Sequence, residues 1–274
     1  MKYEDALDFA REAAQAGGRI ALDLFQRDPA VKQKSDGTLM TEADWAAEQE
    51  IRRLIAQTWP DHNILGEEAG RTRARGGPPV DDAPTWTVDP IDGTNNYIAG
   101  IPVWATLISL REDDTSVLGV CHAPAVGETY EALRGGGARM NSQPIRAESI
   151  DDLGSATVLS TGMEAFIDDE LEHFYIDVVR RCGRSRGFGD FWGHMLVARG
   201  AAHVMIETEM WLWDYAPLQP IVEEAGGRIT QLDGTPCAGG KSCLTTNGAL
   251  HDELVSSFLS SRTSPSERRR GTND

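Results

Sequence analysis

The 274-residue sequence predicts an α/β (α+β) fold made of two connected halves. Helical apolar spacing at the start gives way to short β-rich runs separated by Gly, Pro and acidic turns. After about residue 150 strands and helices alternate again, which indicates a second α/β half. We therefore expect an N-terminal half over residues 1–150, a C-terminal half over residues 151–262 and a disordered polar tail over residues 263–274.

Two amphipathic helices open the first half. Apolar residues recur at helical spacing from Tyr3 to Phe25. Thr41 followed by Asp44 is a capping-box pattern that marks the start of a second helix, which ends at Trp59-Pro60.

The next segment predicts a sheet and one loop. The β-rich runs cover residues 86–88, 105–110, 116–121 and 129–133. Residues 70–84 (GRTRARGGPPVDDAP) lack periodicity and are rich in Gly and Pro, so we expect a surface loop without regular structure. Its arginines leave two interpretations open, a loop that closes over a substrate phosphate and a solvated insertion.

The second half predicts three strands and four helices. The strands cover residues 156–160, 203–207 and 228–232, and the helices cover residues 170–181, 191–199, 216–225 and 251–260. In the helix at 216–225, Pro217 lies near the first turn and Gly226-Gly227 follows the end.

Charge and composition argue against several classes of partner. Lys and Arg number 26 against 43 Asp and Glu, and the net charge of -17 repels the phosphates of nucleic acid. No apolar run approaches the ~20 residues that cross a bilayer, and the acidic start MKYEDALDFAREAAQ does not match a secretory signal. We expect a cytoplasmic protein with no nucleic-acid or membrane partner and with four reduced cysteines.

The most informative segment is WTVDPIDGTNNY, residues 86–97. Pro90 and Gly93 favour a tight turn at the end of a strand. This turn brings the carboxylates of Asp89 and Asp92 to one side, where a cation would bind. Taken alone, both aspartates are also explained as ordinary turn and capping residues.

Neighbouring groups extend this candidate site. The Ile91 carbonyl points to the same side, and the backbone N–H groups of Gly93 and Thr94 at a helix start suit phosphate oxygens. Glu67 lies in a second acidic turn, and Asp214 lies where a strand-like run meets a helix. Individually, Glu67 is also explained as a surface acid and Asp214 as an N-cap.

Three segments resemble, in order, the signature motifs of the inositol monophosphatase superfamily. They are GEE at 66–68, DPIDGTNNY at 89–97 and WDYAPLQPIVEEAGG at 213–227, and the likeness extends from the first helix to about residue 260. The family consists of magnesium-dependent, lithium-sensitive phosphomonoesterases, commonly dimers. The resemblance therefore implies a layered αβαβα sandwich, two or three Mg²⁺ ions, a small-molecule phosphate ester as substrate and a homodimer.

The resemblance also implies a role for each matching residue. The implied metal ligands are Glu67, Asp89, the Ile91 carbonyl, Asp92 and Asp214. The implied catalytic residues around the attacking water are Asp44, Glu67 and Thr94. The implied phosphate-binding groups are Asp92, Gly93 and Thr94. For Asp44 a helix-capping role is an alternative that is compatible with catalysis. Clustered carboxylates without His or Cys suit Mg²⁺, which relieves their mutual repulsion.

The mechanism inferred from this set is metal-assisted hydrolysis. One ion activates the attacking water and a second stabilises the departing oxygen. A covalent phospho-enzyme is not expected, because the phosphatases that use an aspartate nucleophile need a DxDx(T/V) spacing and this chain has DxxD.

Candidate substrate-binding residues lie in the second half. Asp190 follows GFG in a loop before a helix, and Glu207 ends a strand seven residues before Asp214. These three acids are placed to face the leaving group. Arg184 is a further candidate, although Arg184 and Arg186 are equally compatible with the outer surface.

A carboxylate at Asp190 favours a positively charged substrate. In relatives acting on inositol phosphate the position like Asp190 is usually small or hydroxylated, whereas the position like Glu207 is also acidic. GFGDF, GIPVWATL and TTNGALHDEL resemble bacterial histidinol-phosphate phosphatases, whose substrate carries an ammonium group and an imidazole. An N-cap role for Asp190 is the structural alternative.

Three functional hypotheses follow. The first is hydrolysis of histidinol phosphate in histidine biosynthesis. The second is hydrolysis of inositol-1-phosphate or of a broader set of sugar phosphates. The third is a catalytically silent regulatory or binding relative, which the complete set of ligand residues disfavours.

Overall fold

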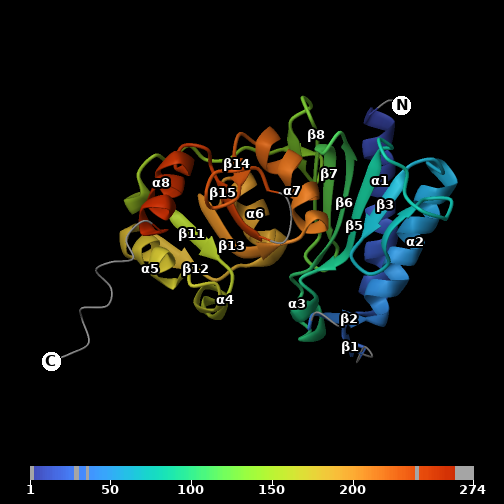
Figure 1. The fold of residues 1–274 in the computed structure, drawn as a ribbon, viewed down its shortest axis with the longest axis horizontal. Helices are drawn as coiled ribbons and strands as arrows, with labels where there is room; N and C mark the ends of the chain where they lie inside the picture. Colours follow the sequence, from blue (N-terminus) through green and yellow to red (C-terminus); the bar gives the residue numbers. More distant parts are fainter. Residues whose placement is uncertain (1–2, 28–30, 35–36, 238–240, 263–274) are drawn as a thin grey trace.

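The computed structural model describes residues 3–27, 31–34, 37–237 and 241–262, and the tail expected at 263–274 lies outside these residues. Helices and sheets alternate in five layers (Figure 1). The order is α1 and α2, an eight-stranded sheet, α6 and α7, a five-stranded sheet, and α5 with α8. The predicted αβαβα sandwich is confirmed.

The helices of these layers lie close to the predicted ranges. Their bounds are α1 (Tyr3–Leu24), α2 (Glu42–Thr58), α5 (Glu172–Arg181), α6 (Asp190–Ala198), α7 (Leu212–Glu224) and α8 (His251–Arg262). Two short helices, α3 (Thr94–Ile98) and α4 (Met163–Asp168), lie at the lower end of the molecule in Figure 1. Among the described helices, none is long and apolar enough to cross a bilayer.

The first sheet has the strand order β10-β9-β8-β7-β6-β5-β3-β4. Its strands are β3 (Asn63–Gly66), β4 (Gly70–Arg73), β5 (Thr85–Asp92), β6 (Ala105–Glu112), β7 (Thr115–Ala123), β8 (Glu128–Leu133), β9 (Ala138–Met140) and β10 (Gln143–Pro144). All neighbours are antiparallel except β3 and β5. The four β-rich runs predicted between residues 86 and 133 are therefore confirmed.

β4 corrects the expectation of an unstructured loop over residues 70–84. This edge strand forms a hairpin with β3, with Gly66 opposite Gly70 and Asn63 opposite Arg73. Its pairing uses backbone groups and needs no apolar alternation, so residues 70–73 carry no periodic apolar pattern. The Arg52 guanidinium also donates a hydrogen bond to Thr72 Oγ1 at 3.0 Å, which ties the strand to α2.

The second sheet has the order β12-β11-β13-β15-β14. Its strands are β11 (Thr157–Ser160), β12 (Arg184–Arg186), β13 (Val204–Met210), β14 (Arg228–Thr230) and β15 (Lys241–Thr246). β11 lies parallel to β12 and β13, whereas β15 lies antiparallel to β13 and β14. The three predicted strands are present, and β12 and β15 were not predicted.

Helix α7 packs between the two sheets and begins earlier than predicted. It starts at Leu212, so Pro217 lies in the second turn and not near the first. Its contact with β7 is close, because a Cβ at Gly119 would lie 1.9 Å from the Pro217 carbonyl oxygen. A glycine at 119 therefore lets the central helix approach the sheet.

The structure also describes the cysteines. All four cysteines are free thiols, as predicted, with Cys237 Sγ 3.8 Å from Cys243 Sγ.

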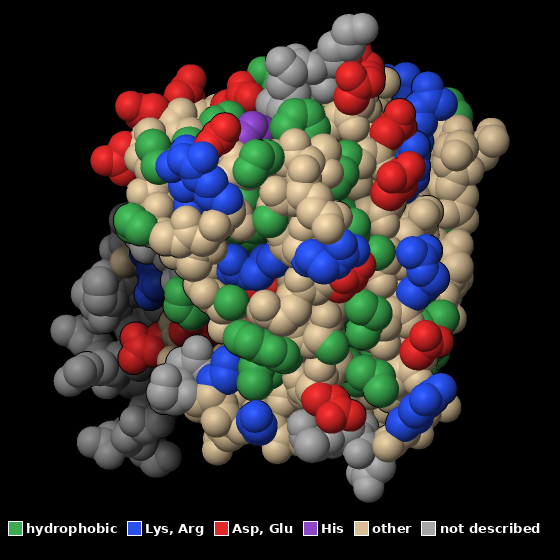
Figure 2. Space-filling view, turned by 90° about the vertical axis from the view of Figure 1, so that its right-hand side faces the viewer, with side chains coloured by type: hydrophobic (Ala, Val, Ile, Leu, Met, Phe, Trp, Pro, Cys, Tyr) green, Lys and Arg blue, Asp and Glu red, His purple; other side chains and the backbone are tan. Residues whose placement is uncertain are grey.

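Seen from the side of α1 and α2, acidic and basic side chains are interspersed on the surface (Figure 2). The excess of carboxylates does not form a single-sign patch on that face.

Candidate active site

Asp89 and Asp92 lie at the end of β5, where its register with β6 is interrupted. The backbone N–H of Ile91 donates a hydrogen bond to Asp89 Oδ1 at 2.9 Å, and Thr106 Oγ1 donates to the Pro90 carbonyl at 2.8 Å. Gly93 completes the turn with φ 85°, a left-handed conformation that favours glycine. The predicted turn therefore forms and orients Asp89, whereas the Asp92 carboxylate accepts a hydrogen bond from the Phe191 N–H at 2.6 Å.

A third carboxylate joins them from the second half. Asp214 lies in the first turn of α7, where its Oδ2 accepts a hydrogen bond from the Trp211 N–H at 2.8 Å. Carboxylate oxygens of Asp89, Asp92 and Asp214 lie within 4.8 Å of one another. They line a cavity of about 300 Å³, the central pocket, together with Glu67 and Ile91.

The GEE turn that carries Glu67 is fixed by a buried acid on α2. Glu48 accepts hydrogen bonds from the backbone N–H groups of Glu68 at 2.7 Å and Ala69 at 3.0 Å. A Cβ at Gly66 would lie 2.2 Å from Glu48 Oε1, so this arrangement needs a glycine there. Glu48 therefore positions the turn, and the sequence analysis did not identify it.

Lys34 is another residue of the central pocket that the sequence analysis missed. Its Nζ lies 2.7 Å from Glu67 Oε1 and 3.1 Å from Glu68 Oε1. Burial disfavours its charge, but the hydrogen bond to Glu67 and the two neighbouring carboxylates raise the pKa of Lys34 above its usual value. The pocket thus contains a protein cation beside its acids.

Thr94 lines the same pocket, and the fully buried Asp44 lies behind it. Thr94 Oγ1 is 3.4 Å from Asp44 Oδ1 and 2.9 Å from the Ile91 carbonyl. Asp44 also accepts a hydrogen bond from the Thr41 N–H at 2.7 Å, which completes the predicted capping box. The capping contact and the contact with Thr94 coexist.

A second cavity of about 320 Å³, the side pocket, shares Asp92 and Asp214 with the central pocket. The N–H of Asp190 donates to Glu207 Oε1 at 2.9 Å, and Asn96 Nδ2 donates to Asp190 Oδ2 at 2.9 Å. The Asp190 carboxylate therefore does not cap α6 and is held by a side chain from the first half. Asp190 has φ 56°, a conformation that is uncommon for residues other than glycine.

Burial and mutual repulsion dominate the electrostatics of both pockets. Burial, followed by neighbouring acids, raises the pKa of Asp89 and Asp92 well above the usual range. Burial also raises the pKa of Asp214 to about 7 and that of Asp44 to about 6. In the side pocket it raises the pKa of Glu207 well above the usual value. Cations would favour the ionised forms.

The donor set of the central pocket fits Mg²⁺. Within the described part of the chain it consists of carboxylates and the Ile91 carbonyl, without a His or Cys among the lining residues. Hard divalent cations prefer such oxygen ligands.

Arg184 lies apart from these pockets. It is exposed on the edge strand β12 and lines neither of them. The arginines of residues 70–84 also lie elsewhere, since Arg73 and Arg75 both pair with Asp61, at 2.9 and 3.2 Å.

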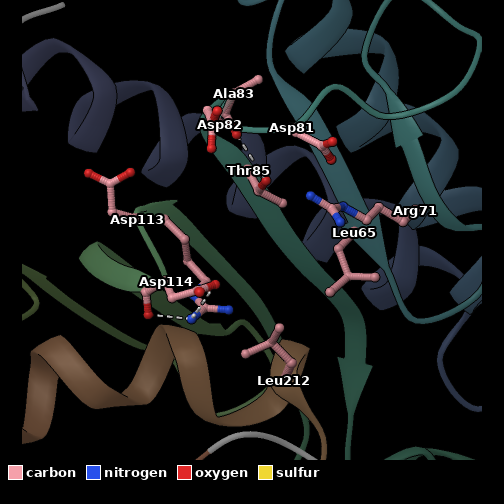
Figure 3. Close-up of a pocket in the computed structure, with 10 residues that line it drawn as sticks. Leu65, Arg71, Asp81, Asp82, Ala83, Thr85, Asp113, Asp114 and Leu212 are labelled. Carbon is pink, nitrogen blue, oxygen red and sulfur yellow. Dashed lines mark hydrogen bonds and ion pairs between the residues drawn. The ribbon is translucent and has the colours of Figure 1, made fainter.

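Arg71 instead faces a third cavity of about 430 Å³ (Figure 3). The aspartates of this cavity come from two turns and point in different directions, with Asp113 directed away from Asp81. They do not converge as the acids of the central pocket do.

Comparisons with known proteins agree with this geometry. The profile of the inositol monophosphatase family matches residues 2–263. The chain is 38% identical over 260 residues to a histidinol-phosphatase of Mycobacterium tuberculosis, covering 93% of this chain and 98% of that protein. It is 37% identical over 254 residues to a histidinol-phosphatase of Chlorobaculum parvum, covering 92% and 96%.

A solved structure gives the same result for the fold. The IMPase of Thermotoga maritima superposes with a TM-score of 0.83 at 29% identity, covering 94% of this chain and 98% of that chain. With the family profile spanning nearly all residues and the three motifs meeting in one pocket, the chain belongs to the inositol monophosphatase family.

Proposed function

We propose that this chain is a Mg²⁺-dependent phosphomonoesterase that hydrolyses histidinol phosphate to histidinol and phosphate. The observation that carries the proposal is a pair of acids, the half-buried Asp190 and the buried Glu207, beside the acidic central pocket. Relatives named histidinol-phosphatase, similar over almost the whole chain, support it.

The central pocket would hold the metal. We assign two or three Mg²⁺ ions to five groups, namely Glu67, Asp89, the Ile91 carbonyl, Asp92 and Asp214. When bound, such ions lower the pKa of water and neutralise phosphate charge. Glu67 would exchange its contact with Lys34 for a metal, leaving Lys34 close to the phosphate.

Residues around the metal would orient the reactants. The Thr94 hydroxyl lies between Asp44 and the Ile91 carbonyl. Thr94 and Asp44 are therefore placed to align the attacking water, and Asp44 to accept its proton. Burial raises the pKa of Asp44 to about 6, which suits a group that accepts a proton near neutral pH. The backbone N–H groups of Gly93 and Thr94 border the pocket and would donate to phosphate oxygens.

The side pocket would bind the leaving group. Asp190 and Glu207 are bonded to each other through a backbone N–H and would receive the α-ammonium of histidinol phosphate. Each charge-assisted bond would contribute about 1.5–3 kcal/mol of selectivity over a neutral polyol. Asn96 Nδ2 donates a hydrogen bond to the carboxylate of Asp190, a residue that lines this pocket.

The test compares kcat/KM on histidinol phosphate and inositol-1-phosphate with Mg²⁺, for the wild type and Asp190→Asn. We expect the wild type to prefer histidinol phosphate and the variant to lose about 10- to 100-fold on that ester only. Asp5→Asn, an exposed acid on α1, is the matched control for lost charge. A wild-type preference for inositol-1-phosphate would reject the proposed substrate.

Inositol-1-phosphate remains the second candidate, because the central pocket alone does not distinguish the two esters. Absence of phosphate release with Mg²⁺, compared with an EDTA control, would instead favour a silent binding relative. Within the same proposal we assign the enzyme to the cytoplasm as a homodimer, with the functional division of the chain near residue 150.

A further inference from the structure

We propose that Trp211 is a specificity-determining residue whose indole face stacks on the imidazole of the substrate. The proposal rests on the proposed function and deepens it. It assigns the aromatic end of the leaving group to a protein surface, whereas Asp190 and Glu207 account only for its ammonium.

Trp211 is placed where the two pockets meet. It lies between the end of β13, which carries Glu207, and the start of α7, which carries Asp214. Trp211 lines both the central pocket and the side pocket. A leaving group that extends from a phosphate in the first pocket into the second would therefore lie beside this residue.

The backbone at Trp211 is fixed, whereas its ring is accessible. The N–H donates to Asp214 Oδ2 at 2.8 Å, which ties the residue to the acidic cluster. The residue is nevertheless 41% exposed. Trp86 and Trp104, by comparison, are fully buried. The exposure of Trp211 leaves a large aromatic surface in contact with water beside a polar pocket.

Trp213 holds this surface in one orientation. The two indole rings are stacked, with centroids 5.6 Å apart and planes inclined by 10°. Parallel stacking occupies one face of the Trp211 ring and restricts its rotation. A preorganised aromatic face loses little conformational entropy when a flat ring binds to it.

The chemistry of the surroundings selects a cationic or electron-poor ring. Indole faces attract cations, and the acids that line both pockets add to the attraction. An imidazolium satisfies this requirement, and a neutral imidazole still offers a flat ring that can stack on the indole. A polyol such as inositol presents no flat π-surface for the same contact.

The experiment uses two phosphate esters that share the ammonium but differ in the ring: histidinol phosphate and the phosphate ester of 2-aminopropan-1-ol. For Trp211→Ala we expect KM for histidinol phosphate to rise about fivefold or more, with kcat within about twofold. KM for the aminopropyl ester should not change. Trp211→Phe should recover most of the loss, because it restores an aromatic face.

Trp45→Ala is the matched control, since Trp45 is 47% exposed on α2 and lines neither pocket. Calorimetric titration with histidinol in the presence of Mg²⁺ gives a readout independent of turnover and should show the same loss of affinity for Trp211→Ala. An equal loss on both esters would assign Trp211 a structural role in starting α7 and overturn the proposal. An unchanged KM would overturn it as well.

Failure of the proposed function has a different signature. If the wild-type enzyme prefers inositol-1-phosphate, both the proposed substrate and the role of Trp211 are rejected. If the wild type prefers histidinol phosphate but Trp211→Ala behaves as the wild type does, only the role of Trp211 is rejected.

Discussion

The central pocket and the side pocket have nearly the same volume, about 300 and 320 Å³, but they hold their acids differently. In the central pocket three carboxylates converge within 4.8 Å. In the side pocket Asp190 and Glu207 are each held by a hydrogen bond from a neighbouring element. The first arrangement concentrates repulsion that a small divalent ion relieves, whereas the second leaves two oriented acceptors for a larger organic cation.

The largest effect is expected from a substitution that removes an acid from the central pocket. Asp89→Asn keeps the shape of the side chain and an acceptor for the Ile91 N–H, but it removes one charge from the cluster. We expect kcat to fall by about a thousandfold or more on every phosphate ester, because the metal site is lost. In EDTA the same variant should unfold at a higher temperature than the wild type, because buried repulsion decreases.

Differential scanning fluorimetry in EDTA, beside steady-state kinetics with Mg²⁺, checks both effects. A variant that loses activity and is also less stable in EDTA would contradict the role assigned to repulsion. Asp190→Asn is the comparison from the side pocket, where activity should fall only on the cationic substrate.

The next largest effect is expected from alanine substitutions at two glycines, one beside each pocket. In Gly66→Ala the new Cβ would lie 2.2 Å from the buried Glu48 carboxylate, which holds the GEE turn. We expect a loss of about 1–3 kcal/mol in the free energy of unfolding and weaker Mg²⁺ activation. In Gly189→Ala the nearest atoms are 3.5 Å away, so stability should change little. Chemical denaturation and Mg²⁺ titration of activity measure the difference, and equal losses would contradict it.

A smaller effect concerns pH in the absence of metal. Burial raises the pKa of Asp44 to about 6 and that of Asp214 to about 7, above the value of about 3.9 for an unfolded aspartate. The folded state therefore binds protons more tightly, and the stability from this preference is lost as pH rises from about 4 through 7. In EDTA we expect Tm to fall by about 5 °C between pH 5 and pH 8.

Saturating Mg²⁺ should reduce this fall, because bound cations favour the ionised carboxylates. Tm measured at each pH with and without Mg²⁺ tests the prediction. A rise of Tm with pH in EDTA would show that the acids are not destabilised in the fold.

The layered fold and the set of acids in the central pocket were predictable from the sequence through its resemblance to a known family, and each of these acids lies in a short motif that carries the resemblance. Asp89, Asp92 and Gly93 are neighbours in one turn. Glu48 carried a weaker signal, since it lies four residues after Asp44 and therefore on the same face of α2.

The remaining contacts depend on packing between distant segments. Asn96 binds Asp190 across 94 positions, and Lys34 reaches Glu67 across 33. Neither pairing follows from local spacing. For the same reason the sequence could not distinguish a substrate-facing Arg184 from an exposed one.

The smallest effect is therefore expected at Arg184. It lies exposed on β12, and a charge surrounded by solvent is screened over about 8 Å at physiological ionic strength. Arg184→Ala should leave kcat/KM on histidinol phosphate within about twofold of the wild type at that ionic strength. Repeating the measurement at low salt sharpens the test, because only a long-range electrostatic effect would then appear. A larger loss at both salt concentrations would mean that the side pocket extends to β12 and that the boundary drawn between the pocket and the outer surface is wrong.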